Sequence, residues 1–127
     1  MSDQAAYQMS VKVVPNYLAD QSEPAEQKYV FSYRVRIENV GTVAAQLISR
    51  HWMMNDANNE LTEVKGLGVV GEQPLIEPGA YFEYVSGTVL KTMNGTMHGF
   101  YFFTAVDGTQ FSADIPMFNL SVPGSLH

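Results

Sequence analysis

Hydrophobic and polar residues alternate along several short stretches of the chain, and the first clear stretch covers residues 7–14. Every second residue from Tyr7 to Val13 is hydrophobic, and the residues between them are mostly polar. Successive side chains of an extended backbone point to opposite faces, so this pattern predicts a strand with one solvated face. Pro15 and the polar residues after it predict a loop over 15–26.

The strongest alternation lies at residues 29–37. One face carries an aromatic or β-branched residue at every odd position, and the other face carries Arg34 and Arg36, with Val30 as the one exception. Aromatic and β-branched side chains suit a pleated, half-buried surface. The segment therefore predicts a strand that packs on one side, and Asn39-Val40-Gly41 predicts the turn that follows it.

Less regular stretches predict the remaining strands. Residues 44–55 place Trp52 on one face together with Ile48, and place Leu47 on the other face together with His51. Further strands are expected at residues 61–65, 81–86, 97–106, 109–115 and 118–122.

Turn signals separate these strands at short intervals. Asp107-Gly108 is a strong hairpin signal, Pro116 is expected to interrupt the last strand, and residues 66–78 are rich in glycine and proline. No stretch has the period of an amphipathic helix. About seven or eight short strands with regular turn signals predict an all-β antiparallel sandwich, formed as one domain over residues 1–127.

The composition narrows the classes of function. The net charge of -6 and the scattered positions of the seven basic residues argue against binding to duplex nucleic acid. The chain has no cysteine, which excludes disulfides and thiolate zinc sites. No secretory signal or membrane-spanning run is visible, so the expectation is a cytoplasmic protein with no membrane contact and no cofactor.

A glycine pattern, Gly66-x-Gly68-x-x-Gly71, invites a dinucleotide-binding interpretation. Such a site needs a helix directly after the glycines, so that the helix N-terminus faces the pyrophosphate. Pro74 and Pro78 follow instead, and two prolines so close together prevent a helix of useful length. The pattern therefore predicts a glycine-rich loop or a bulged strand.

A weaker alternative for the loop Gly66–Gly71 remains open. Successive backbone N–H groups of a glycine loop can form an anion-binding nest without any helix. Lys65 would add positive charge to such a site, and Glu72 would oppose it. The alternative function is binding of a small phosphate-containing ligand, such as pyrophosphate or a dinucleoside polyphosphate.

Several longer motifs occur in a fixed order along the chain. They are Tyr29-Val30-Phe31-Ser32-Tyr33, Ile37-Glu38-Asn39-x-Gly41, Ser49-Arg50-His51-Trp52, Gly66-x-Gly68-Val69-Val70-Gly71-Glu72-Gln73-Pro74, Pro78-Gly79, Tyr84-x-Ser86-Gly87, Gly95-x-Met97-x-Gly99 and Ile115-Pro116-x-Phe118-x-Leu120. Through these motifs the chain resembles the bacterial ApaG proteins almost from end to end.

The resemblance implies a β-sandwich of the fibronectin type III-like or immunoglobulin-like kind. It also implies a family without an established enzymatic activity, associated in bacteria with cobalt and magnesium efflux. Similar domains in eukaryotic F-box proteins imply a binding module that recognises other proteins. The resemblance does not identify the partner protein. A homodimer formed through an edge strand is a further alternative. Arg50, Trp52 and Tyr84 belong to the matching motifs and are expected to be structural.

The motif Arg50-His51-Trp52 suggests roles for its members. Alternation along a strand places Arg50 and Trp52 on one face and His51 on the other. Trp52 is expected in the core, because sandwiches of this kind commonly bury a strand tryptophan. Arg50 is then expected to bind a buried carboxylate, such as Glu38 or Glu83.

Other polar and aromatic residues leave alternatives open. His51, His98 and Asp56 could hold a cation together, but no known ligand spacing is present, which favours two histidines on a strand surface. Tyr81 and Tyr101 are expected to be exposed, either on a partner surface or in cross-strand packing pairs. No set of residues resembles a catalytic triad or a paired acid and base, so a non-enzymatic protein is expected.

Overall fold

The computed structural model describes residues 5–125, and within them it contains two antiparallel sheets and two short 3₁₀ helices. Neither helix has the length and apolar composition needed to span a membrane. The elements in chain order are β1 (Met9–Tyr17), η1 (Ala19–Gln21), η2 (Pro24–Glu26), β2 (Tyr29–Asn39), β3 (Ala45–Asp56), β4 (Leu61–Leu67), β5 (Leu75–Ile76), β6 (Tyr81–Leu90), β7 (Asn94–Ala105) and β8 (Gln110–Ser121).

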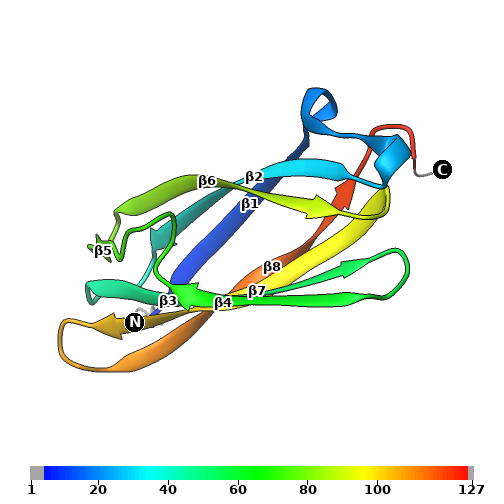
Figure 1. Cartoon of the computed structure of the whole chain (residues 1–127). Helices are drawn as coiled ribbons and strands as arrows, with labels where there is room; N and C mark the ends of the chain where they lie inside the picture. The colour runs from blue at the N-terminus through cyan, green and yellow to red at the C-terminus, as the bar shows by residue number, and fades with distance from the viewer. Residues whose placement is uncertain (1–4, 126–127) are drawn as a thin grey trace.

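The strands form two layers that face each other (Figure 1). One sheet has the order β1-β2-β6, and the other has the order β4-β3-β7-β8 with β5 paired to β3. All pairings are antiparallel. This arrangement confirms the predicted β-sandwich and agrees with a fibronectin type III-like fold.

The core lies between the sheets and is rich in aromatic side chains. Trp52 is 2% exposed and contacts Tyr33 edge-on, with ring centroids 5.3 Å apart. It also lies 6.2 Å from the ring of Tyr101 on the neighbouring strand β7. Phe31 and Phe103 are buried beside this cluster. The predicted core position of Trp52 is therefore confirmed.

Two prolines lie inside strands where the sequence predicts interruptions. Pro15 belongs to β1. Pro116 belongs to β8 (Gln110–Ser121), but the pairing of β8 with β7 shifts register there, so that Pro116 and Met117 form a bulge within the strand. Both strands lie at the edges of their sheets. An edge strand has one side without a pairing partner, so a residue that lacks an N–H is tolerated there. The predicted loop over residues 15–26 therefore begins only after Tyr17.

The predicted face of Leu47 is wrong. Leu47 is fully buried, on the same side of the sheet as Trp52. The pairing of β3 with β7 shifts register between Leu47 and Ser49, so the strand contains a bulge there. One extra residue reverses the alternation, because each inserted residue turns the following side chains to the other face.

The two edges of the sandwich differ. At one edge β1 packs against β8. The ring of Tyr7 lies 5.7 Å from that of Phe111, and its hydroxyl donates to Asp107 Oδ2 at 2.5 Å. At the other edge β6 and β4 end their sheets with no strand pairing between them.

Candidate functional site

The loop after β4 is fixed to the bulge in β3. The N–H of Gly68 donates to the carbonyl of Ile48 at 2.8 Å, and the side-chain amide of Gln73 donates to the same carbonyl at 2.9 Å. Gly68 adopts a φ of +63°, and a Cβ at this position would lie 2.3 Å from the Glu72 carbonyl oxygen. The bulge therefore positions the glycine loop, and Gly68 is required by the shape of the backbone.

The tip of the loop is a tight turn. Val69 and Glu72 exchange backbone hydrogen bonds of 2.8 and 2.9 Å, and the two residues between them have positive φ angles of 43° for Val70 and 81° for Gly71. The prediction of a loop in place of a nucleotide-binding helix is confirmed. Three loop N–H groups, those of Gly68, Val69 and Glu72, already donate to carbonyls.

Gly66 makes room for the side chain of Arg50. A Cβ at Gly66 would lie 2.9 Å from both Nη atoms of Arg50, so the guanidinium covers this glycine. Arg50 Nη1 donates to the carbonyls of Leu67 at 3.0 Å and Gly68 at 2.9 Å. Gly66 and Arg50 are thus matched, and Arg50 holds the start of the loop.

The expected carboxylate partner of Arg50 is wrong. Glu83 pairs with Arg36 on the neighbouring strand, with 3.8 Å between Oε2 and Nη1. Within residues 5–125 no carboxylate lies within ion-pair distance of Arg50. The side chain binds backbone carbonyls instead, and these leave its positive charge without an anionic partner.

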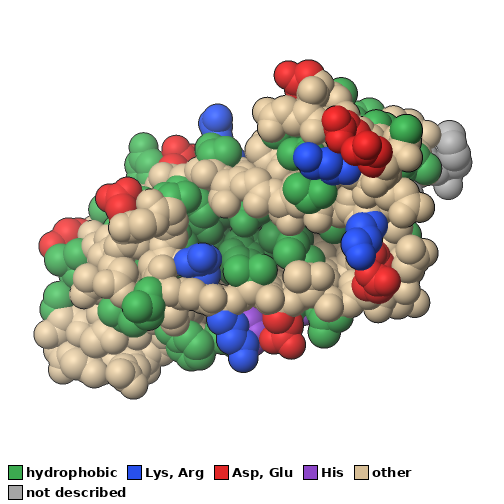
Figure 2. All heavy atoms as spheres, viewed as in Figure 1, with side chains coloured by type: hydrophobic (Ala, Val, Ile, Leu, Met, Phe, Trp, Pro, Cys, Tyr) green, Lys and Arg blue, Asp and Glu red, His purple; other side chains and the backbone are tan. Residues whose placement is uncertain are grey.

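Arg50 faces a hollow between the two sheets at the open edge. The hollow has a volume of about 270 Å³, and a second hollow of about 150 Å³ adjoins it along β4 and β6. In Figure 2 hydrophobic side chains lie at the bottom of a depression with a basic side chain beside it. We call the larger hollow the edge groove; it is lined by Tyr33, Arg50, Trp52, Leu67, Val69, Val70, Gly71, Tyr84 and Ser86.

Phenol groups lie at the inner end of the edge groove. The hydroxyls of Tyr84 and Tyr101 form a hydrogen bond of 2.5 Å. Burial raises the pKa of Tyr33, Tyr84 and Tyr101, while the charge of Arg50 acts in the opposite direction on each. The phenols therefore stay neutral at pH 7, and they offer hydroxyl groups rather than negative charge.

The two tyrosines expected on the surface have different environments. Tyr101 is fully buried, so its predicted exposure is wrong. Its position opposite Arg50 in the β3–β7 register directs it inward, on the face shared with Trp52. Tyr81 is 52% exposed, and the guanidinium of Arg36 lies 3.6 Å from the centre of its ring.

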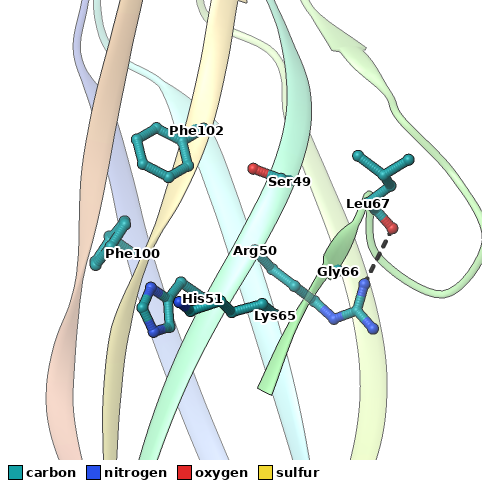
Figure 3. A pocket seen from close by; sticks show the side chains of 8 residues that line it. All are labelled: Ser49, Arg50, His51, Lys65, Gly66, Leu67, Phe100 and Phe102. Atoms are coloured by element: carbon teal, nitrogen blue, oxygen red, sulfur yellow. Dashed lines mark hydrogen bonds between the residues drawn. The ribbon is translucent and has the colours of Figure 1, made fainter. Parts of the chain in front are cut away.

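A second concave surface lies on the outer face of the larger sheet (Figure 3). We call it the outer groove; it has a volume of about 520 Å³ and is lined by Ser49, Arg50, His51, Lys65, Gly66, Leu67, Phe100 and Phe102. The rings of His51 and Phe100 lie 4.9 Å apart, and those of Phe100 and Phe102 lie 5.1 Å apart. Figure 3 shows the side chain of Arg50 leading away from these rings.

The three residues considered for a cation do not converge. His51 Nε2 lies 2.7 Å from Glu63 Oε2, and this hydrogen bond lowers the pKa of Glu63. Asp56 accepts the N–H groups of the following turn. Among the residues that the structure describes, no three His, Cys, Asp or Glu side chains lie close enough together to hold a metal ion.

The structure separates the predicted site residues into two sets. Arg50, Trp52, Tyr84 and Gly71 meet in the edge groove, although the sequence places them in three different motifs. Lys65 and Gly66 line the outer groove, so Lys65 does not face the same space as Gly71. Glu72 is exposed at the turn.

Sequence reasoning missed two residues of the edge groove, Tyr33 and Ser86. They are directly opposite each other in the β2–β6 register. Alternation along β2 already turned Tyr33 inward, but only the pairing of two distant strands places Ser86 beside it. The groove offers a guanidinium and hydroxyl groups, which suit the binding of an oxygen-rich group.

Comparison with known proteins agrees with this fold. Residues 19–105 match the family model described as the ApaG domain. Proteins named ApaG from Thiobacillus denitrificans and Dechloromonas aromatica are 56% and 50% identical over 127 residues, which cover all of this chain and all of each relative. A crystal structure of a Bordetella pertussis protein superposes with a TM-score of 0.93 at 47% identity and covers 96% of this chain and 99% of that one. The chain therefore belongs to the ApaG domain family.

Proposed function

We propose that this protein is a non-enzymatic module that recognises a partner protein through the outer groove. The observation that carries this proposal is the exposure of large apolar side chains around the groove. Leu67 is 75% exposed and Phe102 is 48% exposed. Contiguous exposed apolar surface bordered by polar groups is typical of interaction sites, where aromatic residues are enriched.

The groove combines features that suit a protein segment. Phe100 and Phe102 form an apolar floor, while His51 and Lys65 provide polar groups beside it. β4 is an edge strand, so its outer side has free backbone groups next to the groove. A partner can therefore add an extended segment to β4, or place an apolar side chain against the two rings on β7.

The ApaG resemblance links the family to cobalt and magnesium efflux. A recognition module that contacts a transporter or its regulator would account for such a link without holding the cation itself. A second copy of the same chain is another occupant to be tested, because edge strands also pair between copies.

Two matched variants test the outer groove. Phe102→Ser removes an exposed ring from the groove, and Val14→Ser removes a side chain that is 65% exposed on the other sheet. Affinity capture from cells with the native chain and both variants is expected to lose its reproducible partner only with Phe102→Ser. A partner that binds all three chains equally would refute the proposal. Sedimentation of the three chains tests the second copy.

Binding of a small phosphate-containing ligand at the loop Gly66–Gly71 is the second candidate. It is favoured by Val70 and Gly71, whose N–H groups are not used in the hydrogen bonds that close the turn. Titration with pyrophosphate, followed by amide NMR, is expected to shift these two amides in a saturable way. A response spread evenly over the protein, or no response, would contradict this candidate.

The shape of the loop decides which variant suits that test. Gly68→Val is unsuitable, because it would place a branched side chain at a φ of +63°, against the Glu72 carbonyl, and would break the loop itself. Gly71→Asn is preferable, because no atom lies within 4 Å of a Cβ there and asparagine tolerates positive φ.

A further inference from the structure

We propose that the edge groove binds a carboxylate that has an apolar body, and that Arg50 holds the carboxylate group. This inference goes beyond partner recognition and concerns a different face of β3. The outer groove lies on the outer surface of the larger sheet, whereas the edge groove opens between the two sheets. Arg50 and Leu67 border both grooves, but the two proposals are tested at Phe102 and at Val70, each of which lines only one groove. Failure of one proposal therefore leaves the other intact.

The first support is the set of N–H groups that Arg50 keeps available. A guanidinium has five N–H donors, and Nη1 of Arg50 donates to the carbonyls of Leu67 and Gly68. Nε and Nη2 have no bonded partner within residues 5–125, and neither belongs to the buried polar atoms that lack one. These donors are therefore open to solvent and free to bind a ligand.

The second support is charge. Arg50 is the one charged residue among the described residues that line the edge groove, although the chain as a whole has a net charge of -6. A cation fixed by carbonyls, with no carboxylate beside it, attracts an anion. One positive charge matches one carboxylate, whereas a pyrophosphate brings several negative charges.

The third support is the opposite wall of the groove. Tyr33 comes from β2, and Tyr84 and Ser86 come from β6, where Ser86 is directly opposite Tyr33. Burial raises the pKa of both phenols, so their hydroxyls remain neutral hydrogen-bonding groups. A carboxylate held by Arg50 thus meets hydroxyl groups and no repelling charge.

The fourth support is the apolar rim, which selects the rest of the ligand. Leu67 is 75% exposed and Val70 is 54% exposed, and Trp52 lies beneath them. Such side chains favour an apolar group attached to the carboxylate. A volume of about 270 Å³ accommodates an aromatic or branched acid, and the same chemistry is present in the C-terminal residue of a polypeptide.

Val70 provides a sharp test. Its φ of 43° is unusual for a β-branched residue, whereas aspartate and asparagine tolerate this conformation. Val70→Asp places a carboxylate on the wall of the groove, where it competes for Arg50. Val70→Asn has the same shape without the charge and is the matched control. Arg50 itself is a poor target because it also holds the loop.

The experiment titrates the native chain with benzoate and with the neutral benzamide, in a buffer low in chloride, and follows backbone amides by NMR. Saturable shifts at residues 68–72 and at Ser86 are expected with benzoate only. Val70→Asp should weaken benzoate binding by about tenfold or more, and Val70→Asn should leave it close to the native value. N-acetyl-Ala-Phe and its C-terminal amide, used in the same way, distinguish a polypeptide C-terminus from a free acid.

Several results would overturn the proposal. Equal binding of benzamide would mean that the groove recognises only the apolar ring. Equal affinities of the Val70→Asp and Val70→Asn variants would remove Arg50 as the anchor. Inorganic phosphate that binds as well as benzoate would make this a general anion site, and no saturable shift with any probe would show that the groove does not bind carboxylates.

Discussion

At one edge of the sandwich β1 packs against β8, and at the other a groove separates β6 from β4. The packed edge has a proline in each of its strands, Pro15 and Pro116, which blocks pairing with further strands. β4 and β6 contain no proline. The protein thus protects one edge and leaves the other accessible, where Arg50 and the glycine loop lie.

The comparison also separates two kinds of polar group. At the packed edge, Tyr7 and Asp107 bind each other near the surface. On the side of the open edge, the hydroxyls of Tyr84 and Tyr101 form a buried hydrogen bond. Arg50 lies near them and has no carboxylate partner among the described residues. The first pair joins two segments of chain, whereas the second lies at the inner end of a groove that has room for a ligand.

The largest expected effect contrasts a glycine on the central strand β7 with a glycine on the edge strand β6 of the other sheet. A Cβ at Gly99 would lie 2.0 Å from the His51 carbonyl oxygen, so Gly99→Ala forces backbone apart and should lower the free energy of unfolding by about 3 kcal/mol or more. A Cβ at Gly87 on β6 would lie 3.4 Å from the nearest backbone oxygen, and Gly87→Ala should change stability by less than about 1 kcal/mol. Urea unfolding followed by Trp52 fluorescence measures both.

Equal losses in the two glycine variants would contradict this prediction. They would mean that the edge strand β6 is packed as tightly as the central strand β7.

The next effect is a loss of stability in alkali that originates at the open edge. Burial raises the folded-state pKa of Tyr84 and Tyr101 above the unfolded value of about 10. Their stabilisation is complete below that pH and is lost as the pH rises, by about 1.4 kcal/mol per pH unit for each phenol that stays neutral. Urea unfolding between about pH 9 and pH 11 should show this slope.

Two tyrosine variants isolate the source of the alkaline slope. Tyr101→Phe should make it shallower, while Tyr81→Phe, the same change at an exposed ring, should leave it unaltered. An identical slope in both variants would place the titrating groups elsewhere.

A smaller effect contrasts two arginines. Arg50→Gln loses two hydrogen bonds to carbonyls and should cost about 1–3 kcal/mol of stability. Arg36→Gln loses an ion pair of 3.8 Å whose side chains are each 41% exposed, and should cost less than about 1 kcal/mol. Thermal unfolding of both variants checks the order, and an unchanged melting temperature for Arg50→Gln would refute the holding role of Arg50.

The smallest effect belongs to the packed edge. The hydroxyl of Tyr7 lowers the pKa of Asp107, with further help from Thr109. The resulting stabilisation is present above the unfolded pKa of about 3.9 and is lost as the pH falls through the lower folded value. In Tyr7→Phe the pKa of Asp107 should move back up, which NMR titration of the carboxyl group detects. An unmoved pKa would show that Thr109 alone sets it.

Local patterns predicted most of the fold. The alternation at residues 29–37 identified β2, and the hairpin signal at Asp107-Gly108 identified the turn between β7 and β8. The same reasoning failed at Pro15, which is paired within β1, and was right only in part at Pro116, where a bulge interrupts the pairing but the strand continues. Whether a strand tolerates a proline depends on whether that strand lies at an edge. Whether a strand lies at an edge depends on the whole sheet, and the residues next to the proline in the sequence do not reveal it.

The candidate site was predicted only in part. Arg50, Trp52 and Tyr84 were recognised as members of motifs, but the partner assigned to Arg50 was wrong. Its true partners are the carbonyls of Leu67 and Gly68. Every residue has a backbone carbonyl, so a sequence does not show which carbonyl will bind an arginine. A carboxylate is identified by its residue type, and the prediction therefore favoured a glutamate as the partner of Arg50.

By itself the sequence determined the sandwich class, the positions of most strands along the chain and the burial of Trp52, because hydrophobic period and turn chemistry act over a few neighbouring residues. Only the tertiary structure decided the bulge after Leu47 and the meeting of Arg50 with Tyr33 and Ser86. These depend on the register between distant strands and on which strands end each sheet. An insertion of one residue reverses every face beyond it, so the place where Arg50 points is fixed by the assembled sheets.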